Sequence, residues 1–230
     1  MTVTDVDRPL MLAPAADPAP LGLAAFALTT FLLSAANAGW MGKATGLAWL
    51  GFAFAYGGLA QFAAGMWEFR NRNVFGATAF GTYGGFWIGI GLWALLVAPP
   101  PAGAGPLVAA AHAAAAQKDL GWILLAFAIF NTYMLIISAQ LNMAVFLVFL
   151  TLELTEIFLF LGNFTTKVAA LPPDPTSSGL IVVGGFIGIV TALVAWYTSA
   201  AGVINGMKGG VIAPVGKPLF DMSGRSRAIT

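Results

Sequence analysis

Two carboxylates stand inside one long apolar stretch of the sequence. Glu153 and Glu156 are three residues apart in Leu152-Glu153-Leu154-Thr155-Glu156, so a helix would place them on one face. Carboxylates at such depth in a membrane are costly and usually face a cavity or a partner. Two adjacent charges in a medium of low dielectric constant repel each other, so one group is expected to hold a proton. The pair is therefore predicted to carry a transported proton, the alternative being a hydrogen-bonded pair in a half-solvated pore mouth.

Amide side chains mark other apolar stretches, where they could bind a carboxylate without forming a permanent ion pair. For each of them, a hydrogen bond between neighbouring helices is the alternative role. The candidates are Asn37, Gln61, Asn131, Gln140, Asn142 and Asn163, of which Asn37, Gln61, Asn131 and Asn163 are the predicted substrate contacts.

Other kinds of site find no support in the sequence. There is no Cys, and the one His, His112, stands in an Ala-rich segment. Motifs for zinc, nucleotides or an activated nucleophile are missing from the sequence. We therefore expect no metal, no cofactor and no enzymatic activity.

Composition indicates an all-α polytopic membrane protein. Of the 230 residues, 59% are hydrophobic and 8% are charged, whereas about 25% of residues in soluble domains are charged. A net charge of +1 provides no basic surface for nucleic acid. The apolar blocks are unbroken, whereas strands of a membrane barrel would alternate apolar and polar residues.

Six apolar blocks are long enough to span a bilayer as helices and to contact its lipid. They cover residues 21–40, 47–66, 79–97, 121–137, 144–161 and 180–203, within a membrane domain of residues 17–206 flanked by tails of residues 1–16 and 207–230. The Ala-rich segment 102–117 is expected to form a short helix on the outer surface.

The distribution of basic residues predicts that both termini are cytoplasmic, because cytoplasmic segments carry an excess of Lys and Arg. One side of the predicted bundle holds Arg8, Arg70, Arg72, Lys208, Lys217, Arg225 and Arg227, and the other holds Lys43, Lys118 and Lys167. All of these basic residues lie outside the predicted spans, so amides, hydroxyls and helix ends would have to stabilise an anion that crosses the membrane.

Glycine spacing predicts close helix packing. Gly81, Gly85 and Gly89 recur at every fourth position of the third block, and Gly184 and Gly188 do so in the sixth. Small residues at this spacing let helix backbones approach each other. Oligomerisation through the same faces is a second, compatible interpretation.

The start of the first block resembles a known entry motif. Asp17, Pro18, Pro20, Leu21 and Gly22 belong to a segment similar to Asn-Pro-Ala-Pro-Leu-Gly-Leu of the acetate uptake transporter family, the succinate–acetate permeases. Asp17 replaces the leading Asn, which keeps a capping side chain but adds a negative charge near the cytoplasmic entry. The similarity continues in Tyr56-Gly57-Gly58-Leu59-Ala60-Gln61, Ala64-Gly65, Glu68, Asn73-Val74-Phe75-Gly76-Ala77-Thr78-Ala79-Phe80, Tyr83-Gly84-Gly85-Phe86-Trp87 and Gly162-Asn163.

The resemblance implies six helices, a homohexamer, and a path within each protomer for acetate and sometimes succinate. By alignment of motifs, the family's narrow constriction falls on Phe26, Tyr83 and Leu152. Two apolar groups would exclude water there, and a phenol hydroxyl could pass a carboxylate across. We expect a multi-pass transporter in the plasma membrane for acetate and similar short carboxylates, coupled to protons. A passive channel and a non-transporting membrane scaffold or sensor are the alternatives.

Overall fold

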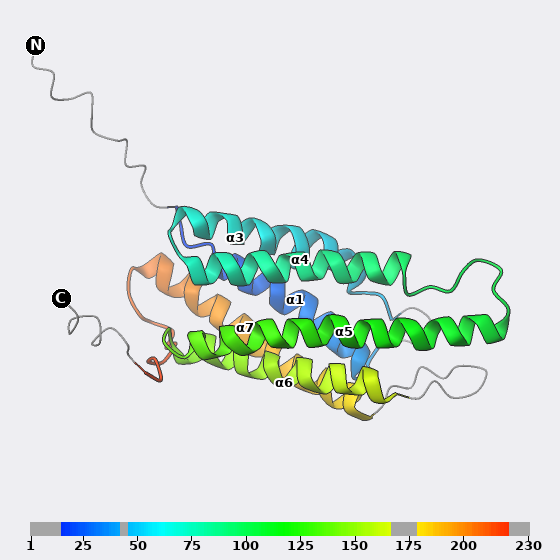
Figure 1. The fold of residues 1–230 in the computed structure, drawn as a ribbon. Coiled ribbons are helices and arrows are strands. Elements are labelled where there is room, and N and C mark those ends of the chain that lie inside the picture. Colours follow the sequence, from blue (N-terminus) through cyan, green and yellow to red (C-terminus); the bar gives the residue numbers. More distant parts are fainter. Residues whose placement is uncertain (1–14, 42–45, 167–178, 221–230) are drawn as a thin grey trace, which may run out of the picture.

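The computed structural model describes residues 15–41, 46–166 and 179–220, and within these ranges the protein is helical with no strand (Figure 1). The long helices run along one common direction. The elements are α1 (Ala19–Asn37), α2 (Leu50–Phe54), η1 (Ala55–Ala60), α3 (Gln61–Arg70), α4 (Val74–Leu96), α5 (Pro106–Ser138), α6 (Met143–Thr165) and α7 (Gly179–Lys208).

Five of these helices, α1, α4, α5, α6 and α7, are long and apolar enough to cross a membrane. The second predicted span corresponds to α2, η1 and α3, which follow one another without a break but change to π-helical hydrogen bonding in η1. Gly57 lies in this π-helical segment, where an added Cβ atom would be 2.6 Å from Thr29 Oγ1 and 2.9 Å from Trp87 Cγ. The glycine therefore lets η1 approach both α1 and α4.

The expected short surface helix over residues 102–117 is wrong as a separate element. α5 begins with Pro106 in its first turn and continues unbroken to Ser138, so the Ala-rich segment is the first part of this helix. Ala has the highest helix propensity and Pro is well suited to the first turn, which explains the continuity. Lys118, expected in a loop, lies within α5, which extends beyond the end of α4 in Figure 1.

Side-chain caps fix two other helix starts. Asn73 Oδ1 accepts a hydrogen bond from Gly76 N at 3.1 Å, so α4 begins several residues before the predicted span. Asn142 Oδ1 accepts from Val145 N at 2.9 Å and starts α6 directly after a short turn. Both caps satisfy backbone donors that a helix start otherwise leaves unpaired.

α1 lies at the centre of the bundle, where it packs along α7 and also contacts α3, η1 and α4. The main apolar core joins it to α4, α5, α6 and α7. This core includes buried Phe26, Tyr83, Met134, Leu152 and Ala195. The surrounding helices therefore hold side chains of α1, α4 and α6 against one another.

Three of the predicted packing glycines, Gly81, Gly184 and Gly188, lie at helix contacts within the chain. A Cβ atom added at Gly65 would be 2.6 Å from the backbone nitrogen of Gly81, so α3 and α4 meet backbone to backbone. One added at Gly184 would be 2.8 Å from Leu159 Cδ2, and one at Gly188 would strike the Ser34 side chain. These contacts bring α7 against α6 and α1.

Gly85 and Gly89 are exposed, and an added Cβ atom would meet no other described atom within 4 Å at either position. We therefore expect Gly85→Leu to leave the fold of a single protomer intact. Circular dichroism of the purified variant in detergent should show the helix content of the wild type, whatever its oligomeric state. A marked loss of folded protomer would mean that this face is covered within the chain, contrary to the structure.

Candidate functional site

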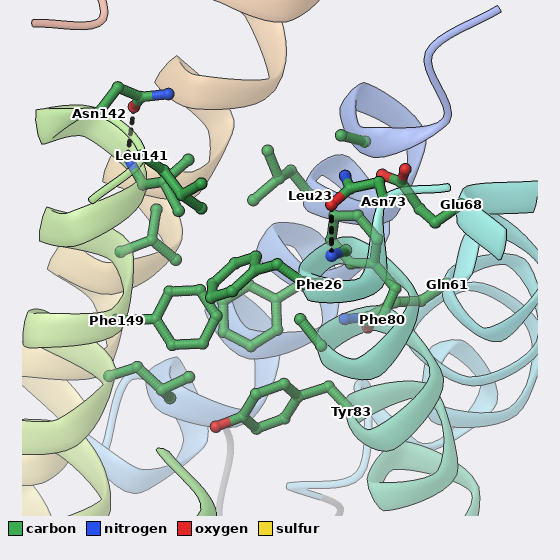
Figure 2. A pocket seen from close by; sticks show the side chains of 17 residues that line it. Leu23, Phe26, Gln61, Glu68, Asn73, Phe80, Tyr83, Leu141, Asn142 and Phe149 are labelled. Atoms are coloured by element: carbon green, nitrogen blue, oxygen red, sulfur yellow. Dashed lines mark hydrogen bonds between the residues drawn. The ribbon is translucent and has the colours of Figure 1, made fainter. Parts of the chain in front are cut away.

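One cavity, cavity A, lies between α1, α3, α4 and α6 and has a volume of about 250 Å³ (Figure 2). Figure 2 shows Glu68 and Asn73 at one end of it and Tyr83 at the other, with the rings of Phe26 and Phe149 between them. Most of the lining is apolar. Its polar side chains are those of Gln61, Glu68, Asn73, Tyr83 and Asn142.

Glu68 is a buried carboxylate in cavity A to which sequence reasoning assigned no role. Its side chain is 1% exposed, and its Oε1 atom has no hydrogen-bond partner in the structure. A Cβ atom added at Gly76 would lie 2.6 Å from both Glu68 Oε1 and Asn73 Nδ2. Only a glycine leaves room for the carboxyl and the amide to converge on the first turn of α4. Gln61 is similarly buried, and its Oε1 is unpaired.

Phe26, Tyr83 and Leu152 are brought together by α1, α4 and α6. All three are buried in the same apolar cluster, and the rings of Phe26 and Tyr83 meet edge to face with centroids 5.8 Å apart. All three also line both cavity A and a second space, cavity B. They therefore stand where the two cavities meet, and their role as a constriction stays a prediction.

Cavity B has a volume of about 50 Å³, and a third space, cavity C, has a volume of about 110 Å³. The polar residues that line cavity B are Thr30, Ser34, Asn37, Tyr83, Trp87, Thr155 and Glu156. Asn37 also lines cavity C, together with Asn163. Because cavity A reaches Ala19 at the start of α1 and cavity C reaches Asn37 at its end, the three spaces follow the length of α1.

The predicted carboxylate pair is divided between two environments. Glu156 is 4% exposed and lines cavity B, and its Oε2 has no hydrogen-bond partner. Glu153 is half-buried and lies outside cavities A, B and C, where it accepts hydrogen bonds from Asn131 Nδ2 at 2.7 Å and Thr132 Oγ1 at 2.8 Å. Of the two predicted proton carriers, Glu156 is therefore the one placed on the row of cavities.

Asn131 holds the hydroxyl of Tyr83. Its Oδ1 lies 2.9 Å from Tyr83 Oη, which is also 3.3 Å from Glu156 Oε1. A phenol has one hydrogen, so it donates to one of these acceptors at a time. The Nδ2 of Asn131 donates to Phe149 O and to Glu153. Asn131 is fully buried but lines none of the three cavities, and its role as a substrate contact stays a prediction.

The other amides lie on the row of cavities. Gln61 lines cavity A, Asn37 lines cavities B and C, and Asn163 lines cavity C while donating to Leu159 O at 2.8 Å. The substrate-contact role of these three stays a prediction. Gln140 lines none of these spaces.

The entry motif holds the start of α1 in contact with α4 and α7. Asp17 Oδ1 accepts from Ala19 N at 2.9 Å, and Ser199 Oγ of α7 donates to Pro20 O at 2.6 Å. A Cβ atom added at Gly22 would lie 2.7 Å from the ring of Phe80 on α4. Of the rest of the motif, Pro18 directly precedes the helix and Leu21 is exposed. The motif thus positions α1 against α4 and α7.

Residues 5–217 match the family model described as the GPR1/FUN34/yaaH family. The chain belongs to the GPR1/FUN34/yaaH family. It is 38% identical over 214 residues to acetate permease A of Emericella nidulans, covering 92% of this chain and 70% of the permease. It is 32% identical over 202 residues to the succinate-acetate/proton symporter SatP of Escherichia coli K12, covering 88% of this chain and 96% of the symporter.

A solved structure, described as the bacterial acetate channel SatP, has the same fold. Its TM-score is 0.71 at 29% identity, covering 88% of this chain and 99% of that one. The resemblance drawn from the motifs is thereby confirmed. These GPR1/FUN34/yaaH relatives are named as permease, symporter and channel and not as enzymes, and together with the five apolar helices they identify a multi-pass membrane protein.

Proposed function

We propose that this protein moves acetate and similar short carboxylates, with succinate as a further substrate, across the plasma membrane through cavities A, B and C. The observation that carries the proposal is the meeting of Phe26, Tyr83 and Leu152 between cavities A and B. Relatives named for acetate and succinate transport support the choice of substrate.

A protein path is useful for this substrate class. A short carboxylic acid is almost wholly ionised at pH 7, as is a carboxyl group with an ordinary pKa of about 4.3. An apolar bilayer strongly resists such an anion. The residues that line cavities A, B and C, all in the described part of the chain, include no Lys, Arg or His. Amides and hydroxyls would therefore hold the substrate without trapping it.

The proposed topology has six spans within residues 17–206, with the unbroken run α2–η1–α3 as the second, and cytoplasmic tails at residues 1–16 and 207–230. The described segments before α1 and after α7 lie at the same end of the bundle in Figure 1, which supports placing both termini on one side. The excess of basic residues on that side supports the cytoplasm. The homohexamer implied by the resemblance belongs to the same proposal, with the exposed Gly85 and Gly89 as one face available to a neighbouring subunit.

Transport coupled to protons is the first mechanism proposed, with Glu156, and less directly Glu153, as proton carriers. Passive permeation is the second candidate, favoured by the description of the similar solved structure as a channel. Purified protein in liposomes, with equal labelled acetate on both sides and an imposed pH gradient, separates them. Accumulation faster than in protein-free liposomes identifies symport. Flux that follows the acetate gradient alone identifies a channel, and no flux above protein-free liposomes would contradict both.

The hydroxyl of Tyr83 offers a mutational test. Tyr83→Phe keeps the ring at the constriction but removes the hydrogen bonds to Asn131 and Glu156. We expect acetate flux to fall about fivefold, the equivalent of one hydrogen bond worth about 1 kcal/mol. Tyr133→Phe is the matched control, since Tyr133 is exposed and lines none of the three cavities. Equal flux in both variants would show that the Tyr83 hydroxyl takes no part.

A further inference from the structure

A buried carboxyl group with an unpaired oxygen stands on each side of the predicted constriction. Glu68 lines cavity A and Glu156 lines cavity B, while Phe26, Tyr83 and Leu152 line both. We propose that Glu156 and Glu68 exchange one proton with the substrate, which therefore passes the constriction as the neutral carboxylic acid. This inference rests on the proposed function and names the two residues that couple the proton to the substrate.

The composition of the cavities favours this arrangement. Apart from Tyr83, which lines both spaces, Glu68 is the ionisable residue of cavity A and Glu156 that of cavity B. Since no Lys, Arg or His of the described residues lines either cavity, a proton is the positive charge available to an incoming carboxylate. An anion between two apolar side chains would lose its hydration without gaining a partner, whereas the neutral acid would not carry that cost.

The charged groups that face the two carboxyls are acidic as well. Asp17, just before α1, acts electrostatically on Glu68, and α4 and the turn before α6 present the neutral amides of Asn73 and Asn142 to cavity A. Glu156 is faced by Glu153 of its own helix and by Tyr83 of α4.

Among the described residues, the other elements around Glu156 present neutral polar groups to it. On α1 these are Thr30, Ser34 and Asn37, which line cavity B. On α7 the Thr191 hydroxyl lies 3.1 Å from that of Thr155, another residue of cavity B. A base that would compete for the proton is therefore lacking among the residues that line the two cavities.

The proton balance is complete without any other reactant. In cavity B, protonated Glu156 gives its proton to a carboxylate oxygen of the substrate and is left ionised. The neutral acid crosses between Phe26, Tyr83 and Leu152 and, in cavity A, gives the proton to the Glu68 carboxylate. Glu68 releases the proton to water and Glu156 takes up another through cavity C. One proton and one carboxylate thus cross together, and the reverse flux reverses each step.

A pH gradient and a membrane potential, imposed separately on liposomes that hold the full-length protein, test whether the substrate crosses as the neutral acid. A proton and a monovalent carboxylate together carry no net charge, so wild-type acetate flux should follow a pH gradient and ignore a membrane potential imposed with potassium and valinomycin. This measurement needs no variant. Acetate flux that follows the potential as an anion current would overturn the proposal.

Variants test whether Glu68 and Glu156 are the two proton-exchanging groups. Glu68→Gln and Glu156→Gln keep the shape of the side chain, and each should lower proton-driven acetate accumulation about tenfold or more. The residual flux should become sensitive to the potential. Glu68→Asp and Glu156→Asp keep a carboxyl and should retain coupling. Asp119→Asn makes the same chemical change at an exposed position of α5 outside the three cavities and should match the wild type.

The outcomes separate this inference from the proposed function. If the wild type gives no acetate flux above protein-free liposomes, the proposed function fails and the inference fails with it. If the wild type transports acetate but both Gln variants accumulate it normally under a pH gradient, the proposed function stands. The assignment of Glu68 and Glu156 as proton-exchanging groups is then wrong.

Discussion

Replacing Leu152 by Ala should admit larger acids to the path. Leu152 is buried against the apolar cluster that holds Phe26 and Tyr83, so loss of its branched end leaves space where cavities A and B meet. We expect the lactate-to-acetate flux ratio to rise about tenfold, which equals about 1.4 kcal/mol in barrier height. Succinate flux should rise too. Labelled lactate, succinate and acetate are compared in liposomes that contain equal amounts of folded protein.

Two precautions make this result interpretable. A buried Leu→Ala change typically costs about 2–5 kcal/mol of stability, so fluxes must be normalised to folded protein. Leu154→Ala is the matched control, because Leu154 is exposed on the same helix and lines none of the three cavities. An unchanged flux ratio in Leu152→Ala would remove Leu152 from the constriction.

Replacing Gly65 by Val should abolish most of the folded protein. A Cβ atom at Gly65 would lie 2.6 Å from the Gly81 backbone nitrogen, and a backbone atom cannot swing aside as a flexible side chain can. α3 would have to separate from α4, which would also displace Gln61 and Glu68 from cavity A. Size-exclusion chromatography in detergent and a thermal unfolding curve measure the loss.

Gly51→Val is the control for this prediction. Gly51 lies in α2 and has no atom within 4 Å of an added Cβ, so the same substitution should be tolerated there apart from a small change in helix propensity. Normal elution and normal thermal stability of Gly65→Val would contradict the close α3–α4 contact.

Hydropathy was enough to predict most of the helices but not their hydrogen bonding or their full length. The second block is apolar throughout, yet η1 changes to π-helical bonding, which depends on how Gly57 packs against α1 and α4. The stretch 102–117 is rich in Ala and too long for a tight turn, so the sequence alone predicts a separate short helix there. The same Ala residues propagate a helix well, and α5 therefore runs through them.

In the candidate site, the sequence likewise did not predict the surroundings of single side chains. Glu153 and Glu156 look equivalent in sequence, but three residues turn a helix by about 300°, which leaves about 60° between them. That difference points Glu156 to cavity B and Glu153 to Asn131 and Thr132 of α5.

Glu68 stands near the end of its span, where a carboxylate is ordinarily solvated. Its burial comes from α1 and α4, and the glycine at position 76 makes room for it. The spacing of Gly76 after Glu68 in the shared motif was the available signal, but a single sequence does not say which glycines make room for a neighbour.

A single cysteine at Leu152 tests the central claim most directly, namely that substrate passes between Phe26, Tyr83 and Leu152. The natural chain contains no Cys, so Leu152→Cys introduces one unique thiol. The measurement is acetate flux before and after treatment with a small charged methanethiosulfonate reagent, with and without excess acetate. The account predicts that modification blocks the flux and that acetate slows the block, since both occupy one path. Complete modification of the thiol with acetate flux unchanged would contradict it.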